Sequence, residues 1–177
     1  MDTKAKKSLG QNFLQDQSVI ERILSVAEVG ETDRIFEIGP GTGALTQALS
    51  KTGASVLAIE IDPQLVERLN RIFVQSESIS ILEGSILDMN LEELLVHAGY
   101  EYQKYKVVAN IPYYITAPII RTLLSLRSQA SSITLMVQNE VAERIVAKPG
   151  SMSILSVMAQ YYAEVEKCFF VPRTAFD

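Results

Sequence analysis

The sequence predicts an α/β domain built on one mostly parallel β-sheet with helices on both faces. Three observations support this fold class: short apolar runs alternate with helix-like segments, a glycine-rich loop follows the first run, and no internal repeat breaks the alternation. Strands that alternate with helices at this spacing typically pair in parallel through right-handed crossovers. The length of 177 residues, with 47% hydrophobic and 21% charged, suits a single compact domain.

The first half of the chain predicts three strands and three helices. Asp16 is a suitable N-cap for a helix whose apolar residues recur at helical spacing up to Ala27, and Gly30 ends it. A proline at position 63 fits the first turn of a later helix. The predicted strands are residues 34–38, 55–59 and 79–82, and the other two helices are residues 44–51 and 63–73.

The second half continues the alternation. Asn110-Ile111-Pro112 ends a strand, Pro149-Gly150 ends a helix, and the β-branched run 133–137 is typical of a buried strand. The predicted helices are residues 91–96, 116–126, 140–147 and 153–161, and the predicted strands are residues 106–109, 133–137 and, last, 163–170.

Composition excludes several classes of protein. The chain has neither an apolar run of roughly 18 residues nor a charged-then-apolar leader, so we expect a cytoplasmic protein without a membrane segment. One cysteine, Cys168, and one histidine, His97, are too few for an internal disulfide or a standard zinc site, and Cys168 is expected to be a small buried apolar residue. The net charge of −5 argues against a surface that binds nucleic acid all over, although Lys4, Lys6 and Lys7 form either a cationic arm or a solvated terminus.

The loop after the first predicted strand indicates a nucleoside cofactor. Gly39, Gly41 and Gly43 permit positive φ angles and a close approach of ligand to backbone, with a helix N-terminus directly behind them. The strand also delivers Glu37 just before the loop. Glu60 follows Gly39 at the end of the second strand, where an acid that binds a ribose is expected. This pattern alone does not separate NAD from S-adenosylmethionine.

The loop after the fourth strand favours methyl transfer over hydride transfer. Asn110, Pro112 and Tyr113 place an amide, a rigid turn and an aromatic ring at a strand end. The lone pair of an exocyclic nucleobase amine is delocalised into the ring, and acceptors that hold both amine hydrogens turn it toward a methyl donor. Asn110 Oδ1 and a backbone carbonyl of the Ile111-Pro112 turn are candidate acceptors, while Tyr113 is a candidate stacking surface for an extruded base.

Four separated motifs resemble one family, the ribosomal RNA adenine N6,N6-dimethyltransferases. They match its housekeeping, kasugamycin-resistance branch, which acts on the small subunit, more closely than its macrolide-resistance branch, and Pro40 and Thr42 favour that choice. The motifs are Ser8-Leu9-Gly10-Gln11-Asn12-Phe13-Leu14, Glu37-Ile38-Gly39-Pro40-Gly41-Thr42-Gly43, Glu60-Ile61-Asp62 and Asn110-Ile111-Pro112-Tyr113-Tyr114.

The resemblance implies a class I S-adenosylmethionine-dependent methyltransferase domain, Rossmann-like, over residues 1–177. It also implies roles for the site residues. Against the cofactor it places Gln11, Asn12, Leu14, Gly39, Gly41, Glu60, Ser85 and Asn110, and against the target adenine it places Asn110, Pro112, Tyr113 and Phe176.

The chain departs from the family pattern at three places. The family has an acid after the glycine of the third strand, where this chain has Ser85, so either Ser85 or Asp88 is expected to meet the cofactor adenine. The loop at residues 149–155 is shorter than usual. The family continues past Asp177 into a last antiparallel strand and a helical domain, so we expect a sheet that lacks its last strand, with an exposed edge near residues 163–170.

The sequence therefore predicts transfer of methyl groups from S-adenosylmethionine to N6 of two adjacent adenosines near the 3′ end of small-subunit ribosomal RNA. The expected partner is that RNA or a pre-30S particle, with no membrane and no metal, and the chain is expected to be a monomer. Two alternatives remain: an NAD-dependent oxidoreductase, and a cofactor-binding fragment without turnover.

Overall fold

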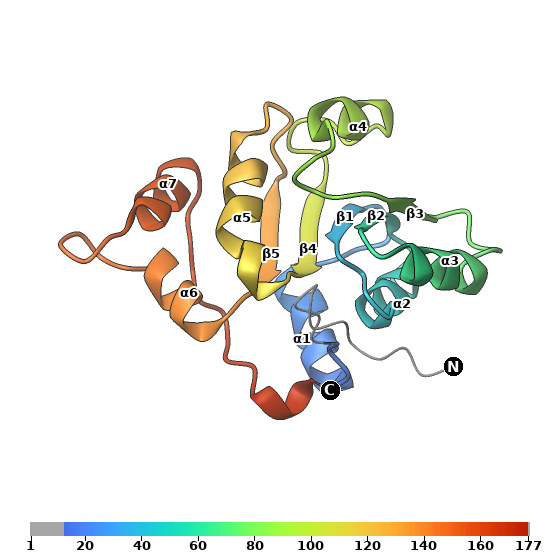
Figure 1. The fold of residues 1–177 in the computed structure, drawn as a ribbon, viewed down its shortest axis with the longest axis horizontal. Helices are drawn as coiled ribbons and strands as arrows, with labels where there is room; N and C mark the ends of the chain where they lie inside the picture. The colour runs from blue at the N-terminus through green and yellow to red at the C-terminus, as the bar shows by residue number, and fades with distance from the viewer. Residues whose placement is uncertain (1–12, 177) are drawn as a thin grey trace.

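A five-stranded parallel sheet forms the centre of the computed structural model, which describes residues 13–176. The strand order is β3-β2-β1-β4-β5, so the order reverses between β1 and β4, and every neighbouring pair is parallel (Figure 1). The strands are β1 (Arg34–Ile38), β2 (Ser55–Glu60), β3 (Ile79–Glu83), β4 (Lys106–Asn110) and β5 (Ser132–Met136). The predicted α/β class with a mostly parallel sheet is confirmed.

Helices cover both faces of the sheet. Their starts follow the sequence signals: Asp16 accepts hydrogen bonds from the amides of Ser18 and Val19, and Asp62 caps a helix that opens with proline. The helices are α1 (Gln17–Val26), α2 (Ala44–Ser50), α3 (Pro63–Ile72), α4 (Leu91–His97), α5 (Thr116–Ser125), α6 (Asn139–Ile145) and α7 (Ile154–Tyr162), with the short 3₁₀ turns η2 (Tyr113–Ile115) and η3 (Arg173–Ala175).

Alternate residues of the central strands enter two separate hydrophobic cores. Ile35 of β1 packs with residues of α1, α2 and α3 on one face, while the next residue, Phe36, packs with residues of α4 and α5 on the other. Because both faces of the sheet are covered, every residue of β1 and β2 except the first is buried, and most of these buried residues are apolar. A third cluster joins α5 to α7 through Ile120, Leu124 and Ala159.

The predicted strand at residues 163–170 is wrong. After α7 the chain runs without regular structure to η3, and most of its side chains are exposed, Cys168 included. Phe169 instead lies under the guanidinium of Arg22 from α1, 4.2 Å from its ring centroid. A β-prone sequence forms a strand only where a neighbour supplies ladder hydrogen bonds, and in residues 13–176 no strand lies beside this segment. Among the described residues the edge strands of the sheet are β3 and β5, and residues 163–170 do not form an edge.

Two structural findings concern membrane-spanning helices and metal-binding groups. Within residues 13–176, no helix is both long and apolar enough to cross a membrane. Over the same residues, histidine, cysteine and carboxylate side chains form no group of three or more that could hold a metal ion.

Candidate active site

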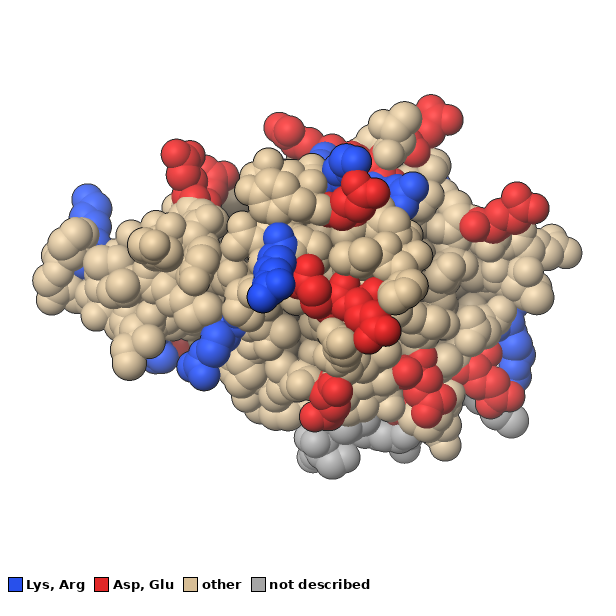
Figure 2. Space-filling model, turned by 90° about the horizontal axis from the view of Figure 1, so that it is seen from above, with Lys and Arg blue, Asp and Glu red and all other residues tan. Residues whose placement is uncertain are grey.

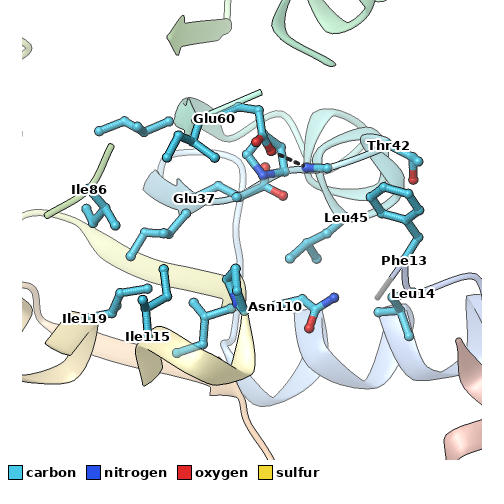
Figure 3. Close-up of a pocket in the computed structure, with 18 of the residues that line it drawn as sticks. Phe13, Leu14, Glu37, Thr42, Leu45, Glu60, Ile86, Asn110, Ile115 and Ile119 are labelled. Atoms are coloured by element: carbon cyan, nitrogen blue, oxygen red, sulfur yellow. Dashed lines mark hydrogen bonds between the residues drawn. The ribbon is translucent and has the colours of Figure 1, made fainter. Parts of the chain in front are cut away.

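A cleft opens at the carboxyl ends of β1, β2 and β4, where the strand order reverses. This is the position at which open α/β sheets bind their ligands. The cleft contains about 980 Å³ of empty space when its open mouth is included. Figure 3 shows Glu60 on one side of the cleft in this view and Asn110 on the other.

The glycine loop after β1 forms one wall with bare backbone. Gly39, Gly41 and Gly43 all have positive φ angles, as the sequence predicted, and the Gly39 amide donates to the Ile59 carbonyl at 2.9 Å. A Cβ on Gly41 would lie 3.2 Å from the Phe13 ring, so a side chain there would crowd the cleft. Glycine at position 41 therefore keeps room for a ligand against the backbone.

Glu60 fastens this loop to the end of β2. Its Oε2 accepts from the Gly41 amide at 3.0 Å, the bond drawn in Figure 3, and its Oε1 accepts from the Asp62 amide at 2.9 Å. Burial raises the pKa of the Glu60 carboxyl, and the amide hydrogen bonds partly oppose that rise. Each carboxylate oxygen has a further lone pair, so Glu60 can still accept a ligand hydroxyl.

Glu37 lies deeper in the cleft, at the end of β1. It is 1% exposed, and burial raises the pKa of its carboxyl to about 8. Nearby, the Thr46 hydroxyl opposes this rise and the Glu60 carboxylate adds to it. Neither Glu37 Oε2 nor Thr46 Oγ1 has a hydrogen-bond partner of good geometry among residues 13–176. The Glu37 carboxyl is therefore mostly protonated at neutral pH.

The loop after β4 forms the opposite wall. Asn110, paired in register with Met136 of β5, lines the cleft. The Pro112 carbonyl accepts from the Thr116 hydroxyl at 3.3 Å, which ties the loop to α5. Tyr113 is half-buried, and burial and the nearby Glu140 carboxylate raise the pKa of its phenol. An amide and an aromatic ring thus face a hollow bounded by carboxylates and glycines.

The structure brings most of the predicted site residues together. Those that line the one cleft are Leu14, Gly39, Gly41, Glu60, Ser85, Asn110, Pro112 and Tyr113. Gln11 and Asn12 lie outside the described residues. Asp88 is exposed and does not line the cleft, whereas Ser85 does. Phe176 does not line the cleft either: it forms an antiparallel bridge with Leu14 and packs against the core around α1.

Sequence reasoning missed the apolar lining of the cleft. Phe13, Leu45, Ile86, Ile115 and Ile119 all face it. Phe13 belongs to the first family motif but was given no role, and the other four resemble ordinary core residues, so no local signal sets them apart from the two hydrophobic cores.

The electrostatic character of the cleft is acidic. The described residues that line it include two glutamates, of which Glu37 is mostly protonated at neutral pH, and no lysine, arginine or histidine. On the face of the molecule in Figure 2, red and blue side chains are interspersed and form no continuous basic patch. The cleft itself is therefore suited to a ligand that carries positive charge, and a phosphate would meet no cationic side chain there.

Comparisons with known proteins give a consistent result. A family model described as "Ribosomal RNA adenine dimethylase" matches residues 2–177. A protein of Levilactobacillus brevis called "Ribosomal RNA small subunit methyltransferase A" is 43% identical over 174 residues, covering 97% of this chain and 59% of that protein. A protein of the same name from Listeria monocytogenes is 42% identical over 174 residues with the same coverage. The chain thus spans about three fifths of the length of the curated relatives it matches.

Two solved structures share this fold. A dimethyladenosine transferase from Plasmodium falciparum superimposes with a TM-score of 0.68 at 27% identity, covering 83% of this chain and 51% of the other. The 23S rRNA methyltransferase ErmE superimposes with a TM-score of 0.67 at 29% identity, covering 84% of this chain and 57% of the other.

Proposed function

Because the chain belongs to the ribosomal RNA adenine dimethylase family, we propose that its cleft binds S-adenosylmethionine and transfers methyl groups to N6 of adenosine in ribosomal RNA. The proposed target lies in small-subunit RNA, since the curated relatives at 42–43% identity carry a small-subunit name. Two adjacent adenosines near its 3′ end are the target that the motif resemblance implies. The observation that carries the proposal is the meeting of the glycine loop, Glu60 and the Asn110 corner in one cleft.

The described residues fit the proposed cofactor. Gly39 and Gly41 leave room for its methionine end, Glu60 accepts from its ribose hydroxyls, and Ser85 faces its adenine. The hydrogen-bonding atom Glu37 Oε2, buried without a partner, and the absence of cationic side chains from the described lining agree with a positively charged ligand. The oxidoreductase alternative is not supported, because family membership points to methyl transfer and the glutamates disfavour a pyrophosphate.

The corner after β4 orients the acceptor amine. Asn110 Oδ1 accepts one N6 hydrogen, and the Ile111 carbonyl accepts the other, since the Pro112 carbonyl already accepts from Thr116. The two acceptors turn the nitrogen lone pair out of the ring and toward the donor. Tyr113 stacks on the extruded base. Phe176 lies beside Leu14 and outside the cleft, so it would have to move to contact the base.

When bound, S-adenosylmethionine supplies an electrophilic methyl group on a sulfonium. The N6 lone pair forms the new N–C bond as the C–S bond breaks, the C–S electron pair stays on sulfur, and the amine gives one proton to solvent. Asn110 and the Ile111 carbonyl hold the amine in line through both transfers. The proposed partner is small-subunit RNA or a pre-30S particle, met in the cytoplasm by a monomer, without a metal or a membrane.

Labelled S-adenosylmethionine and unmethylated small subunits test the proposal. We expect the parent chain and Asn70→Ala, a control on the exposed face of α3, to label the small-subunit RNA, and Asn110→Ala to lose at least 100-fold of the rate (about 3 kcal/mol) while still binding S-adenosylhomocysteine. Equal labelling by Asn110→Ala would refute the role of the amide. Cofactor binding without any labelling by the parent chain would instead favour the fragment without turnover.

A further inference from the structure

Glu37 is the buried acid that the proposed transfer does not use. It stands at the carboxyl end of β1 and lines the cleft, yet it is 1% exposed and its Oε2 has no hydrogen-bond partner of good geometry within residues 13–176. An acid in this state has only two stable arrangements: it keeps its proton, or it ionises beside a positive charge.

The strand order places Glu37 between the two ends of the proposed ligand. β1 lies between β2, which carries Glu60, and β4, which carries Asn110. A ligand whose ribose is held at Glu60 and whose methyl group faces Asn110 must cross the end of β1. The sulfur lies between ribose and methyl in that ligand, so its positive charge arrives above Glu37.

We infer that Glu37 senses the charge of the ligand: its carboxyl gives up a proton when a sulfonium enters the cleft and regains one when the neutral thioether remains. This inference rests on the proposed cofactor. The charges balance over one transfer, because the sulfonium loses its positive charge, the amine loses one proton to solvent, and the carboxylate takes up one proton from solvent.

The surroundings of Glu37 favour the protonated state before binding. From β2, Glu60 faces it with a second carboxyl, and burial together with this neighbour raises the pKa of Glu37 to about 8. From α2, Thr46 contributes a hydroxyl, and α2 has no charged residue. Asn110 at the end of β4 and the Tyr113 phenol from the turn after it line the cleft, and no cationic side chain does so among the described residues.

As a consequence, the pH changes the affinity of the cleft for the methyl donor, S-adenosylmethionine, relative to its affinity for the product, S-adenosylhomocysteine. The neutral product brings no charge that would ionise Glu37, so the affinity of the cleft for the product is independent of the Glu37 proton. Affinity for the donor is linked to proton release, so it rises with pH up to about 8, by at most about tenfold per pH unit. The ratio of donor affinity to product affinity therefore increases between pH 6.5 and pH 8.

Calorimetry in buffers of different ionisation enthalpy counts the released protons. At pH 7 we expect the parent chain to release close to one proton on binding S-adenosylmethionine and close to none on binding S-adenosylhomocysteine. Glutamine mimics the protonated acid, so Glu37→Gln should release no proton from this position with either ligand. Any proton that the ligand's own amine releases appears in the count for Glu37→Gln and can be subtracted from the count for the parent. Glu83→Gln, an exposed carboxyl at the end of β3, is the control and should match the parent.

Two results would overturn the inference. One is an equal proton count for the two ligands on the parent chain, a comparison that needs no variant to fold. The other is a proton count for S-adenosylmethionine that Glu37→Gln leaves unchanged. Failure of both ligands to bind the parent chain would overturn the proposed function together with this inference, whereas binding with equal proton counts overturns the inference alone.

Discussion

Replacement of Glu37 by glutamine should change how the stability of the protein depends on pH. The pKa of the Glu37 carboxyl is about 8 in the folded protein and 4.5 in its ordinary state, so the folded state holds a proton that the unfolded state has lost. The parent protein is therefore expected to lose free energy of unfolding as pH rises from about 4.5 to about 8. Glutamine does not titrate, so the free energy of unfolding of Glu37→Gln should not show this decrease with pH.

The magnitude follows from the interval between the two pKa values. At about 1.4 kcal/mol for each pH unit, the interval from 4.5 to about 8 gives an upper limit of about 5 kcal/mol. At pH 5 the two proteins should differ little, and at pH 9 Glu37→Gln should be the more stable by up to that amount. The repulsion between Glu37 and Glu60 is one of the causes of the raised pKa, so this limit already includes it.

Urea unfolding at pH 5, 7 and 9 measures this difference. Glu83→Gln, which removes an exposed carboxyl at the end of β3, is the matched control and should follow the parent at every pH. A difference between Glu37→Gln and the parent that stays constant from pH 5 to pH 9, or one that reverses sign, would refute the assignment of a protonated acid in the cleft.

Three further changes test the packing and the cleft. Gly43→Ala would place a Cβ 2.5 Å from Leu69 Cδ2 at a φ of +89°, so urea unfolding should show a loss of about 1–3 kcal/mol, and an unchanged midpoint would contradict this close contact. Tyr105→Phe removes a buried hydroxyl that donates to a backbone carbonyl at 2.6 Å, and thermal unfolding should show a cost of about 1 kcal/mol. Ser85→Ala should weaken S-adenosylhomocysteine binding in calorimetry while Asp88→Asn does not, and the opposite order would move the adenine to Asp88.

The functional loops were predictable because their signals are local. Positive φ angles at Gly39, Gly41 and Gly43 follow from the need for a tight turn between a strand and a helix, and the structure has all three. Glu60 and Asn110 follow predicted strands directly, and parallel strands bring their carboxyl ends to one edge of the sheet. The distance between these residues in the chain is no obstacle, because the strand order alone brings them together.

Other features of the cleft depend on elements remote in sequence. The pattern around Glu37 is that of an ordinary strand end, and only the helices packed over β1 and the carboxyl from β2 bury it and raise its pKa. The sequence likewise did not show that the turn after β3 places the Ser85 side chain at the cleft and the Asp88 side chain in solvent. Phe176, which the resemblance assigned to the adenine, is placed beside Leu14 by a bridge between the two ends of the described chain.

The sequence by itself determined the α/β class, the positions of the central strands, the glycine turn and the family, because hydrophobic periodicity and turn chemistry act over a few neighbouring residues. Only the tertiary structure decided that residues 163–170 form no strand, that β3 and β5 are the edges of the described sheet, and that Glu37 is a buried acid whose Oε2 has no good partner among the described residues. Strand formation requires a ladder partner and a pKa shift requires desolvation, and each of these is supplied by residues distant in the chain.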